Sequence, residues 1–471
     1  MSPQRQSELY YRAGVSKSEA GHQFEALAYF SDAIRLNQES EAAYFRRGIV
    51  KQALGDFPGA INDYSRAIEL NPANQRAFYG RGLCQVGLKD YQDAITDFNE
   101  AIELNPSDAQ ALYGRGLGYL GLKDWKAAIT NFSAAIGLDP DNADAYNYRG
   151  VARAQLRDTE GALGDLNKVV ELEPEEATAY RNRATVEGVF KEYEKAIADA
   201  SKAIKLDGND AISYRLRGDA ESILKNYRDA LADFNKSIEL NPQVAESYAS
   251  RGNVRMLSGD FAGASADFDK AIQLNPQIPL ALAGRGTLEK KRGDYDHALA
   301  DLEQAAKLGS QFAQTYQMLG YLQDDLFQWR PALESLRKAL EIDPSLDYPR
   351  FRIYLIRCRL GEREEATNEL SSYLSTLQGK NAQDWPACIG RFLIGNVPES
   401  DFLSQATTTA KRPSDKGGQV CETYYYAAMK HLIGEDKEGA AALFQKCLDT
   451  GEKNYSEFSS ASTELRALKH P

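Results

Sequence analysis

The sequence is poor in the residues that build disulfides, metal sites and most catalytic centres. Its 471 residues include only five cysteines and four histidines. There is no Cys-x-x-Cys pair, and the histidines have neither metal-ligand nor triad spacing, so we expect no disulfide framework and no metal site. A P-loop and a Rossmann dinucleotide-binding fingerprint are also missing. These absences predict a protein without cofactor, metal or catalytic residue.

Long apolar runs are missing as well, and basic residues are in the minority. The opening residues, MSPQRQSELYYRAG, contain no apolar stretch of the kind that forms a signal peptide or a membrane span. We therefore expect no membrane insertion and a cytoplasmic location, with a periplasmic or envelope location as the alternative if an export signal has been removed. The net charge is -12, which repels a phosphate backbone, so nucleic acid is not an expected partner.

What the sequence does contain is a strict repeat. An alanine recurs every 34 residues, at Ala26, Ala60, Ala94, Ala128, Ala162, Ala196, Ala230, Ala264, Ala298, Ala332 and Ala366. A fixed period of this length indicates one supersecondary unit stacked on copies of itself, each copy covering the apolar face of its neighbour.

Each unit has the pattern of two helices. In the unit at residues 41–74, apolar and small side chains recur at helical spacing on both sides of Gly55-Asp56. Gly55 is a typical end for a first helix, and Asp56 is a typical cap for a second one. Asn71-Pro72 then ends the second helix and starts the next unit. The unit is therefore predicted to be a helix-turn-helix hairpin.

A small residue also recurs in the first helix of each unit. It stands at Gly48, Gly82, Gly116, Gly150, Ala184, Gly218, Gly252, Gly286 and Gly320. Because glycine costs about 1 kcal/mol in a helix interior, its recurrence indicates that a facing helix approaches closely at this position. Cys84, two residues after one of these glycines, is expected to be a small core residue.

The unit resembles the tetratricopeptide repeat (TPR), whose pattern has a small residue early in the first helix, alanine in the second and proline at the end. The resemblance covers residues 7–380. It implies an all-α fold, a right-handed α-solenoid superhelix of helix-turn-helix hairpins closed by a C-terminal helical cap. The eleven predicted units are 7–40, 41–74, 75–108, 109–142, 143–176, 177–210, 211–244, 245–278, 279–312, 313–346 and 347–380.

The register breaks after residue 380, and residues 381–471 are predicted to form a C-terminal module. It consists of a linker with a short helix and a loop at 407–418, a degenerate repeat at 421–454 and a capping helix. The stretches CETYYY and NYSEF in this module are similar to the end of bacterial NlpI-type TPR proteins, which are envelope adaptors that bring a protease to cell-wall substrates.

A second pattern runs through eight consecutive repeats. Arginine precedes the small residue of the first helix, at Arg47, Arg81, Arg115, Arg149, Arg183, Arg217, Arg251 and Arg285. Sixteen residues later stands an aspartate, or Asn131 in one repeat. We infer a contact between the two helices of the same repeat, which specifies geometry more than it adds stability. The alternative is an arginine ladder that binds anionic ligands.

TPR stacks present their first helices toward a concave groove, where the family usually binds peptides or partner helices. The candidate groove residues are Phe45, Ile49, Tyr79, Leu83, Tyr113, Leu117, Asn147, Arg181, Arg215, Asp219 and Asn253. Those in repeats two to four are apolar, and those from repeat five onward are polar. The resemblance thus implies a partner with an apolar end near Tyr79 and an adjoining polar stretch near Arg181 and Arg215.

The expected function is a non-enzymatic scaffold or adaptor that binds protein or peptide partners. One alternative is an envelope adaptor of the NlpI type that recruits a protease or hydrolase. The other is an enzyme that uses the C-terminal module, where His431 lies near Cys421 and Glu422 in the sequence. The groove aromatics could also serve only to complete helix packing. If they bind a partner, alanine at Tyr79 and Tyr113 should weaken its capture with little change in thermal stability.

Overall fold

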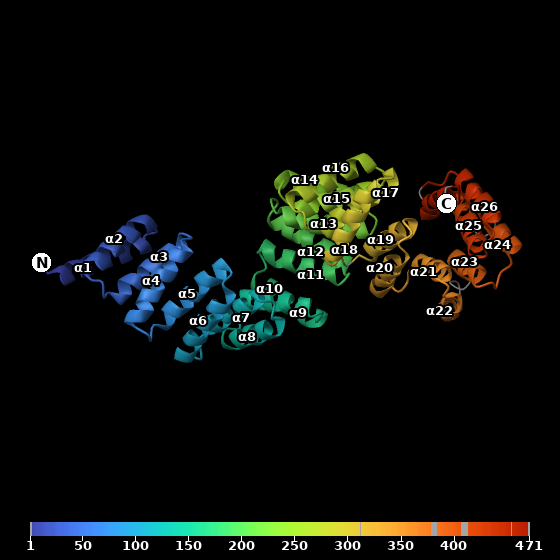
Figure 1. Cartoon of the computed structure of the whole chain (residues 1–471). Coiled ribbons are helices and arrows are strands. Elements are labelled where there is room, and N and C mark those ends of the chain that lie inside the picture. Colours follow the sequence, from blue (N-terminus) through green and yellow to red (C-terminus); the bar gives the residue numbers. More distant parts are fainter. Residues whose placement is uncertain (1, 311, 378–383, 407–412, 454, 470–471) are drawn as a thin grey trace. The chain divides into compact units, whose positions relative to one another are not determined.

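The regular elements in a computed structural model of the chain are all α-helices within the part that the structure describes (Figure 1). That part comprises residues 2–310, 312–377, 384–406, 413–453 and 455–469. The prediction of an all-α repeat solenoid is confirmed. Contacts between residues divide the chain into two units, Met1–Leu240 and Asn241–Pro471. The limits predicted for the eleven repeats and for the module at 381–471 stay predictions.

In the first unit, helices follow one another as antiparallel pairs, with a first and a second helix in each repeat. They are α1 (Pro3–Glu19), α2 (Gln23–Leu36), α3 (Glu41–Ala53), α4 (Phe57–Leu70), α5 (Gln75–Leu88), α6 (Tyr91–Leu104), α7 (Ala109–Gly121), α8 (Trp125–Leu138), α9 (Ala143–Gln155), α10 (Thr159–Leu172), α11 (Ala177–Val189), α12 (Tyr193–Leu206), α13 (Ala211–Ile223) and α14 (Tyr227–Leu240).

The second unit begins with the same kind of pair and ends in helices of unequal length. They are α15 (Ala245–Leu257), α16 (Phe261–Leu274), α17 (Pro279–Arg292), α18 (Tyr295–Lys307), α19 (Ala313–Asp325), α20 (Trp329–Ile342), α21 (Tyr348–Arg359), α22 (Arg363–Thr376), α23 (Trp385–Leu393), α24 (Glu399–Gln405), α25 (Pro413–Ile433), α26 (Lys437–Asp449) and α27 (Ser456–Lys469).

The turn inside each hairpin has the chemistry expected from Gly55-Asp56. Gly55 has a left-handed φ of 80°, which glycine adopts without steric cost after a helix end. The Asp56 side chain accepts a hydrogen bond of 3.0 Å from the Gly59 amide and so caps α4. Lys89 and Lys123 take the left-handed position in the next two repeats, with φ values of 68° and 60°. The turn geometry is therefore kept even where the glycine is not.

The recurring glycine of the first helix makes room for a large side chain of its own repeat, which is an aromatic ring in repeats two to four. A Cβ on Gly82 would lie 2.9 Å from the Phe98 ring, and one on Gly116 would lie 2.6 Å from the Phe132 ring. In both repeats the ring stands sixteen residues after the glycine, on the second helix, and is fully buried. The close approach predicted from the sequence is thus made by an aromatic side chain as well as by the facing helix.

Repeat six has neither the glycine nor the ring. Its first helix carries Ala184 instead of glycine, and its second helix carries Ala200 where Tyr64 and Phe98 stand in repeats two and three. Both alanines are buried, in one small cluster with Ala196 and Ala220. In repeat six the first helix therefore carries a Cβ where the second helix carries only the small side chain of Ala200. Cys84 is fully buried as predicted.

The C-terminal helices form a common core with the last repeat. Phe351, Ile389, Phe392, Tyr426 and Phe444, from helices α21, α23, α25 and α26, are buried in one hydrophobic cluster. The loop predicted at 407–418 is wrong over its second half, since α25 begins at Pro413 and includes Gly417 and Gly418. Proline is favourable in the first turn of a helix, because its missing N–H has no partner there. Residues 407–412 lie outside the described part.

Candidate partner-binding surface

The repeated arginines contact the acids of their own repeats, as the sixteen-residue spacing predicts. Arg47 donates to both carboxylate oxygens of Asp63, at 2.8 and 2.7 Å. The same two-bond contact recurs at Arg81, Arg149, Arg183, Arg217, Arg251 and Arg285. Arg115 donates to Asn131 at 2.7 Å. Such paired bonds hold the planar guanidinium in one orientation.

A third helix takes part in this contact, which the sequence analysis missed. Arg47 also donates to Ser31 on the second helix of the preceding repeat, at 3.1 Å, and Arg81 donates likewise to Ser65 at 2.9 Å. The sequence contains a pattern that could have predicted this contact, because serine or asparagine stands sixteen residues before most of these arginines. Each guanidinium therefore links two repeats. Its donors are engaged inside the stack, so this geometry does not support the ladder for anionic ligands.

Repeat six departs from the charge pattern as well. In repeat two, Lys51 lies four residues after the arginine and forms a second ion pair with Asp63, at 2.8 Å. The corresponding residue of repeat six is Glu187, which is 5% exposed. Its Oε2 atom has no hydrogen-bond partner within the described residues. Burial, with the nearby charge of Asp199, raises the pKa of the Glu187 carboxyl to about 7.

In the wild type, Glu187 should make the folded state less stable as the pH rises. We expect Glu187→Gln to abolish this decrease. The carboxyl has a pKa of 4.5 in its ordinary environment and of about 7 in the folded chain. Between these values the folded state keeps a proton that the unfolded state releases. The stabilising contribution is therefore complete below the unfolded pKa and is lost as the pH rises through 7. Its upper bound is roughly 3 kcal/mol.

Urea unfolding at about pH 5 and about pH 8 measures this effect. Glu221→Gln is the matched control, because Glu221 occupies the same position in repeat seven and accepts a hydrogen bond from Asn226 at 2.6 Å. We expect the stability difference between the two pH values to shrink in the Glu187 variant only. Equal pH dependence in wild type and both variants would contradict the assignment.

The apolar groove residues of repeats two to four are half-buried, and one is exposed. The ring centroids of Tyr79 and Phe98 are 5.9 Å apart, and those of Tyr113 and Phe132 are 5.8 Å apart. Burial raises the pKa of both tyrosines. Phe45, Leu83 and Leu117 are also half-buried, and Ile49 is 38% exposed. The rings therefore have packing contacts and an accessible side at once.

The polar groove residues of the first unit already have partners on the chain. Arg215 donates to Asp219 at 2.7 Å, and Arg181 forms an ion pair with Asp210 at 3.3 Å. Asn147 accepts a hydrogen bond of 2.9 Å from Asn182. The half-buried Asn253 belongs to the second unit, whereas the other ten candidates belong to the first. A partner's acidic groups would thus compete with the chain's own carboxylates at both arginines.

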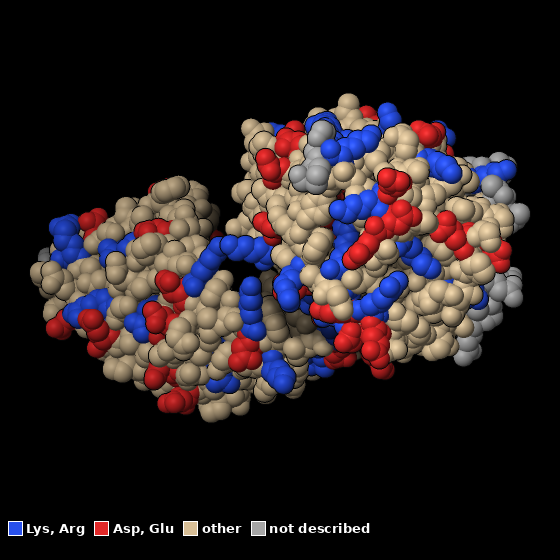
Figure 2. Space-filling model, turned by 45° about the vertical axis from the view of Figure 1, so that its right-hand side comes forward, with Lys and Arg blue, Asp and Glu red and all other residues tan. Residues whose placement is uncertain are grey.

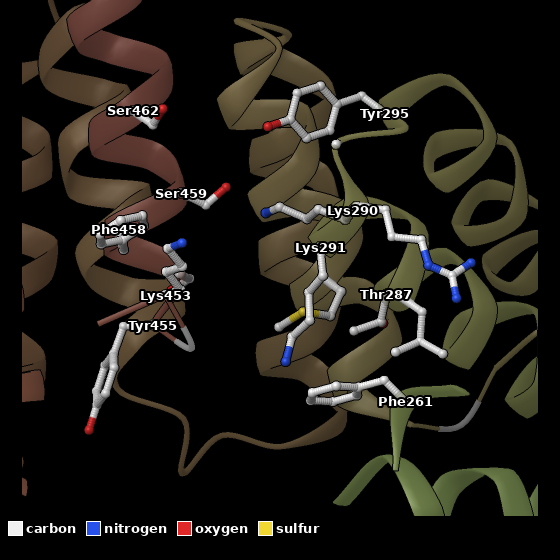
Figure 3. A pocket seen from close by; sticks show the side chains of 15 residues that line it. Phe261, Thr287, Lys290, Lys291, Tyr295, Lys453, Tyr455, Phe458, Ser459 and Ser462 are labelled. Atoms are coloured by element: carbon white, nitrogen blue, oxygen red, sulfur yellow. The ribbon is translucent and has the colours of Figure 1, made fainter. Parts of the chain in front are cut away.

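The second unit contains a cationic pocket that the sequence analysis missed (Figure 3). Its volume is about 600 Å³. One side comes from the ends of neighbouring repeats, with Lys291 and Tyr295, and the other from the last helix and the residues before it, with Lys453 and Phe458. Nothing in the 34-residue period predicts this juxtaposition, because α27 lies outside the repeats and more than a hundred residues along the chain.

Other kinds of site find little support within the described residues. No group of histidine, cysteine, aspartate and glutamate there could hold a metal ion. None of the described helices combines the length and the apolar character needed to cross a bilayer. His431, the centre of the enzymatic alternative, contacts Asp436 at 2.6 Å and Glu399 at 3.0 Å. The contacts of His431 in the described part do not include Cys421. The sulfur of Cys421 lies 3.1 Å from that of Cys447.

Family models describe much of the chain. Models with the description "Tetratricopeptide repeat" match residues 45–109, 85–130, 215–279, 250–313 and 313–346. A model described as "TPR repeat" matches residues 119–157. All of these matches lie within residues 7–380, the region predicted to contain the repeats. No curated protein matches the chain, so the NlpI-type likeness of its C-terminal end remains a prediction.

Several solved structures resemble the chain. Cut9, from the APC/C hetero-tetramer Cut9-Hcn1, is 16% identical with a TM-score of 0.50, over 99% of this chain and 98% of that one. Yeast Tom70 is 16% identical over 82% of this chain and 95% of that one, with a TM-score of 0.41. MamA from Desulfovibrio magneticus RS-1 is 26% identical over 36% of this chain and 96% of that one, with a TM-score of 0.35. The similarity to Cut9 shows the fold alone.

Proposed function

The chain belongs to the tetratricopeptide repeat family of protein-interaction scaffolds, and we propose that its groove across repeats two to four binds an apolar segment of a partner protein. The groove is formed by Phe45, Ile49, Tyr79, Leu83, Tyr113 and Leu117. Helices α3, α5 and α7, which carry these residues, contact one another side by side. Equivalent positions on them therefore form a continuous strip.

The observation that carries this proposal is the exposure of apolar side chains along that strip. Ile49 leaves 38% of its surface to solvent although it stands beside the buried Gly48 and Val50. The half-buried rings of Tyr79 and Tyr113 lie on the next two first helices. Tyrosine suits a binding surface, because a large apolar ring and a polar hydroxyl are presented at little cost in conformational entropy.

Charge supports a protein partner in preference to a polyanion. Acidic residues exceed basic ones by twelve over the whole chain. On the face shown in Figure 2, basic and acidic side chains are mixed and form no continuous basic stripe. A nucleic-acid backbone is normally bound by a segregated basic surface.

Peptide selection tests the proposal. We expect peptides selected from a random displayed library on the full-length chain to be rich in leucine and aromatic residues. Ile49→Ser and Leu83→Ser should weaken their binding about tenfold, because each removes apolar surface from the strip. Fluorescence anisotropy measures the affinity. Tyr79→Ala is a less clean probe than the sequence suggested, since that ring also packs against Phe98.

Leu104→Ser is the matched control. Leu104 is 43% exposed and ends α6, a second helix, outside the strip. Its replacement should leave peptide binding unchanged, and circular dichroism melting should show all three variants folded. Equal losses at Leu104 and Ile49, or selected peptides without apolar enrichment, would disprove the proposed groove.

A further inference from the structure

The cationic pocket of the second unit contrasts with the charge of the chain. Four basic side chains line it, Lys290, Lys291, Arg292 and Lys453, and no acidic side chain lines it among the described residues. Lys290 is nevertheless neutralised by Asp325, at 2.9 Å. Within the described part, Lys291, Arg292 and Lys453 have no ion pair. Uncompensated positive charge is therefore concentrated here in a chain of net charge -12.

The same pocket offers apolar and aromatic surface. Phe261, Tyr295, Met318 and Phe458 line it, and Phe261 is 40% exposed. The Lys291 Nζ atom lies 4.5 Å from the centre of the Phe261 ring. Figure 3 shows Lys453 extending from the α27 side into the space in front of the repeats, and Lys291 extending toward Phe261 on the other side. A volume of about 600 Å³ is in the range of pockets that enclose a ligand.

The α27 wall of the pocket is fixed by a buried polar network on its other face. Arg352, which is 1% exposed, donates to Ser460 at 2.7 Å, and Ser460 in turn donates to Asp325. Arg359 binds Glu464 at 2.6 Å. Ser460 and Glu464 stand one helical turn apart, so α27 is held along one face. Phe458, Ser459 and Ser462 on its other side are left to line the pocket.

We propose that this pocket binds an acidic peptide segment of a partner protein that also carries an apolar or aromatic side chain. Lys291 and Lys453 would bind its carboxylates from the two sides of the pocket, and Phe261 and Phe458 would contact its apolar group. The serines of α27 can donate hydrogen bonds to a peptide's carbonyl groups. This surface is distinct from the apolar strip of repeats two to four and goes beyond the function proposed for it.

The structure favours a peptide over a free anion for two reasons. The basic side chains are spread along opposite walls and do not converge on one point, as a small anion would require. Apolar rings also occupy a large share of the lining, and a compact inorganic ion would leave them uncovered. A segment with alternating acidic and apolar side chains satisfies both features of the pocket.

The probe is a short labelled peptide in which glutamate alternates with leucine and phenylalanine, compared with the same peptide carrying glutamine at each glutamate. We expect the full-length chain to bind the acidic peptide more tightly, with an affinity that falls as salt rises. Lys291→Glu and Lys453→Glu together should weaken its binding by about tenfold or more. Fluorescence anisotropy gives the affinities.

Lys437→Glu is the control for net charge, because Lys437 is exposed on α26 and does not line the pocket. Ile49→Ser separates this site from the groove of the first unit and should leave acidic-peptide binding unchanged. Equal binding of the two peptides, equal losses in Lys437→Glu, or complete competition by inorganic phosphate would overturn the proposal. So would self-association of the wild type that Lys291→Glu abolishes, because the occupant would then be a second copy of the chain.

Discussion

Replacement of Arg352 by alanine is expected to destabilise the second unit by about 3–5 kcal/mol, the usual cost of removing one partner from a buried ion pair. Arg352 is 1% exposed and donates to Asp324 at 3.0 Å and to the Tyr425 hydroxyl at 2.5 Å. Its loss leaves the buried carboxylate of Asp324 without its ion-pair partner. It also removes the bond to Ser460 that ties α27 to the last repeats.

Because Asp324 can take up a proton, the stability lost in Arg352→Ala should depend on pH. Burial already raises the pKa of the Asp324 carboxyl, and Arg352 opposes that rise. Without the arginine, the pKa should rise further, so the folded variant keeps a proton that its unfolded state releases. Both proteins should lose stability as the pH rises above the unfolded aspartate pKa of about 3.9, and the variant should fall further behind wild type once the pH passes the raised pKa of Asp324 in folded wild type. At lower pH the deficit should shrink.

Denaturant unfolding at several pH values measures both effects. Arg337→Ala is the control, since Arg337 is exposed on α20 in the same unit. Its replacement should change stability by less than about 0.5 kcal/mol. A loss of similar size in the two variants, or a deficit in Arg352→Ala that grows toward low pH, would show that the network does not depend on the arginine as described.

Truncation of Phe98 to alanine is expected to cost about 3–5 kcal/mol, because it leaves a cavity between three helices. The ring is fully buried. It fills the space left by Gly82 on its own first helix and by Gly114 on the next, where added Cβ atoms would lie 2.9 and 2.5 Å from it. Thermal or urea unfolding of the full-length chain measures the loss.

The same contact predicts that the effects of two substitutions are not additive. Gly82→Ala should destabilise the wild type by its clash with Phe98. In the Phe98→Ala background it should stabilise instead, by up to about 1 kcal/mol, since alanine is the better helix former. Gly164→Ala on α10 is the control, because a Cβ there would meet nothing within 4 Å. It should stabilise both backgrounds alike, and additivity of the Gly82 and Phe98 effects would refute the contact.

The repeat and its internal contacts could be predicted because they are local. The contact between Arg47 and Asp63 joins neighbouring helices of one hairpin. Because the pattern occurs in eight repeats, its sixteen-residue spacing could be recognised in the sequence. The pairing of Ala184 with Ala200 is equally visible in the sequence once the role of the glycines is known. By contrast, the start of α25 at Pro413 was predicted as loop, since residues 407–418 form a polar stretch. Burial of the following tyrosines against the last repeat extends the helix instead.

By itself the sequence determined the solenoid, because a 34-residue period leaves each hairpin an apolar face that only another copy can cover. It also supplied the residues of the proposed groove, of which the apolar ones lie on helices α3, α5 and α7. Only the tertiary structure decided how α27 packs, since the contacts of Ser460 with Asp325 and Arg352 join residues more than a hundred positions apart. Such contacts depend on how the last repeats stack, and no periodic pattern encodes them. The cationic pocket exists because of that packing alone.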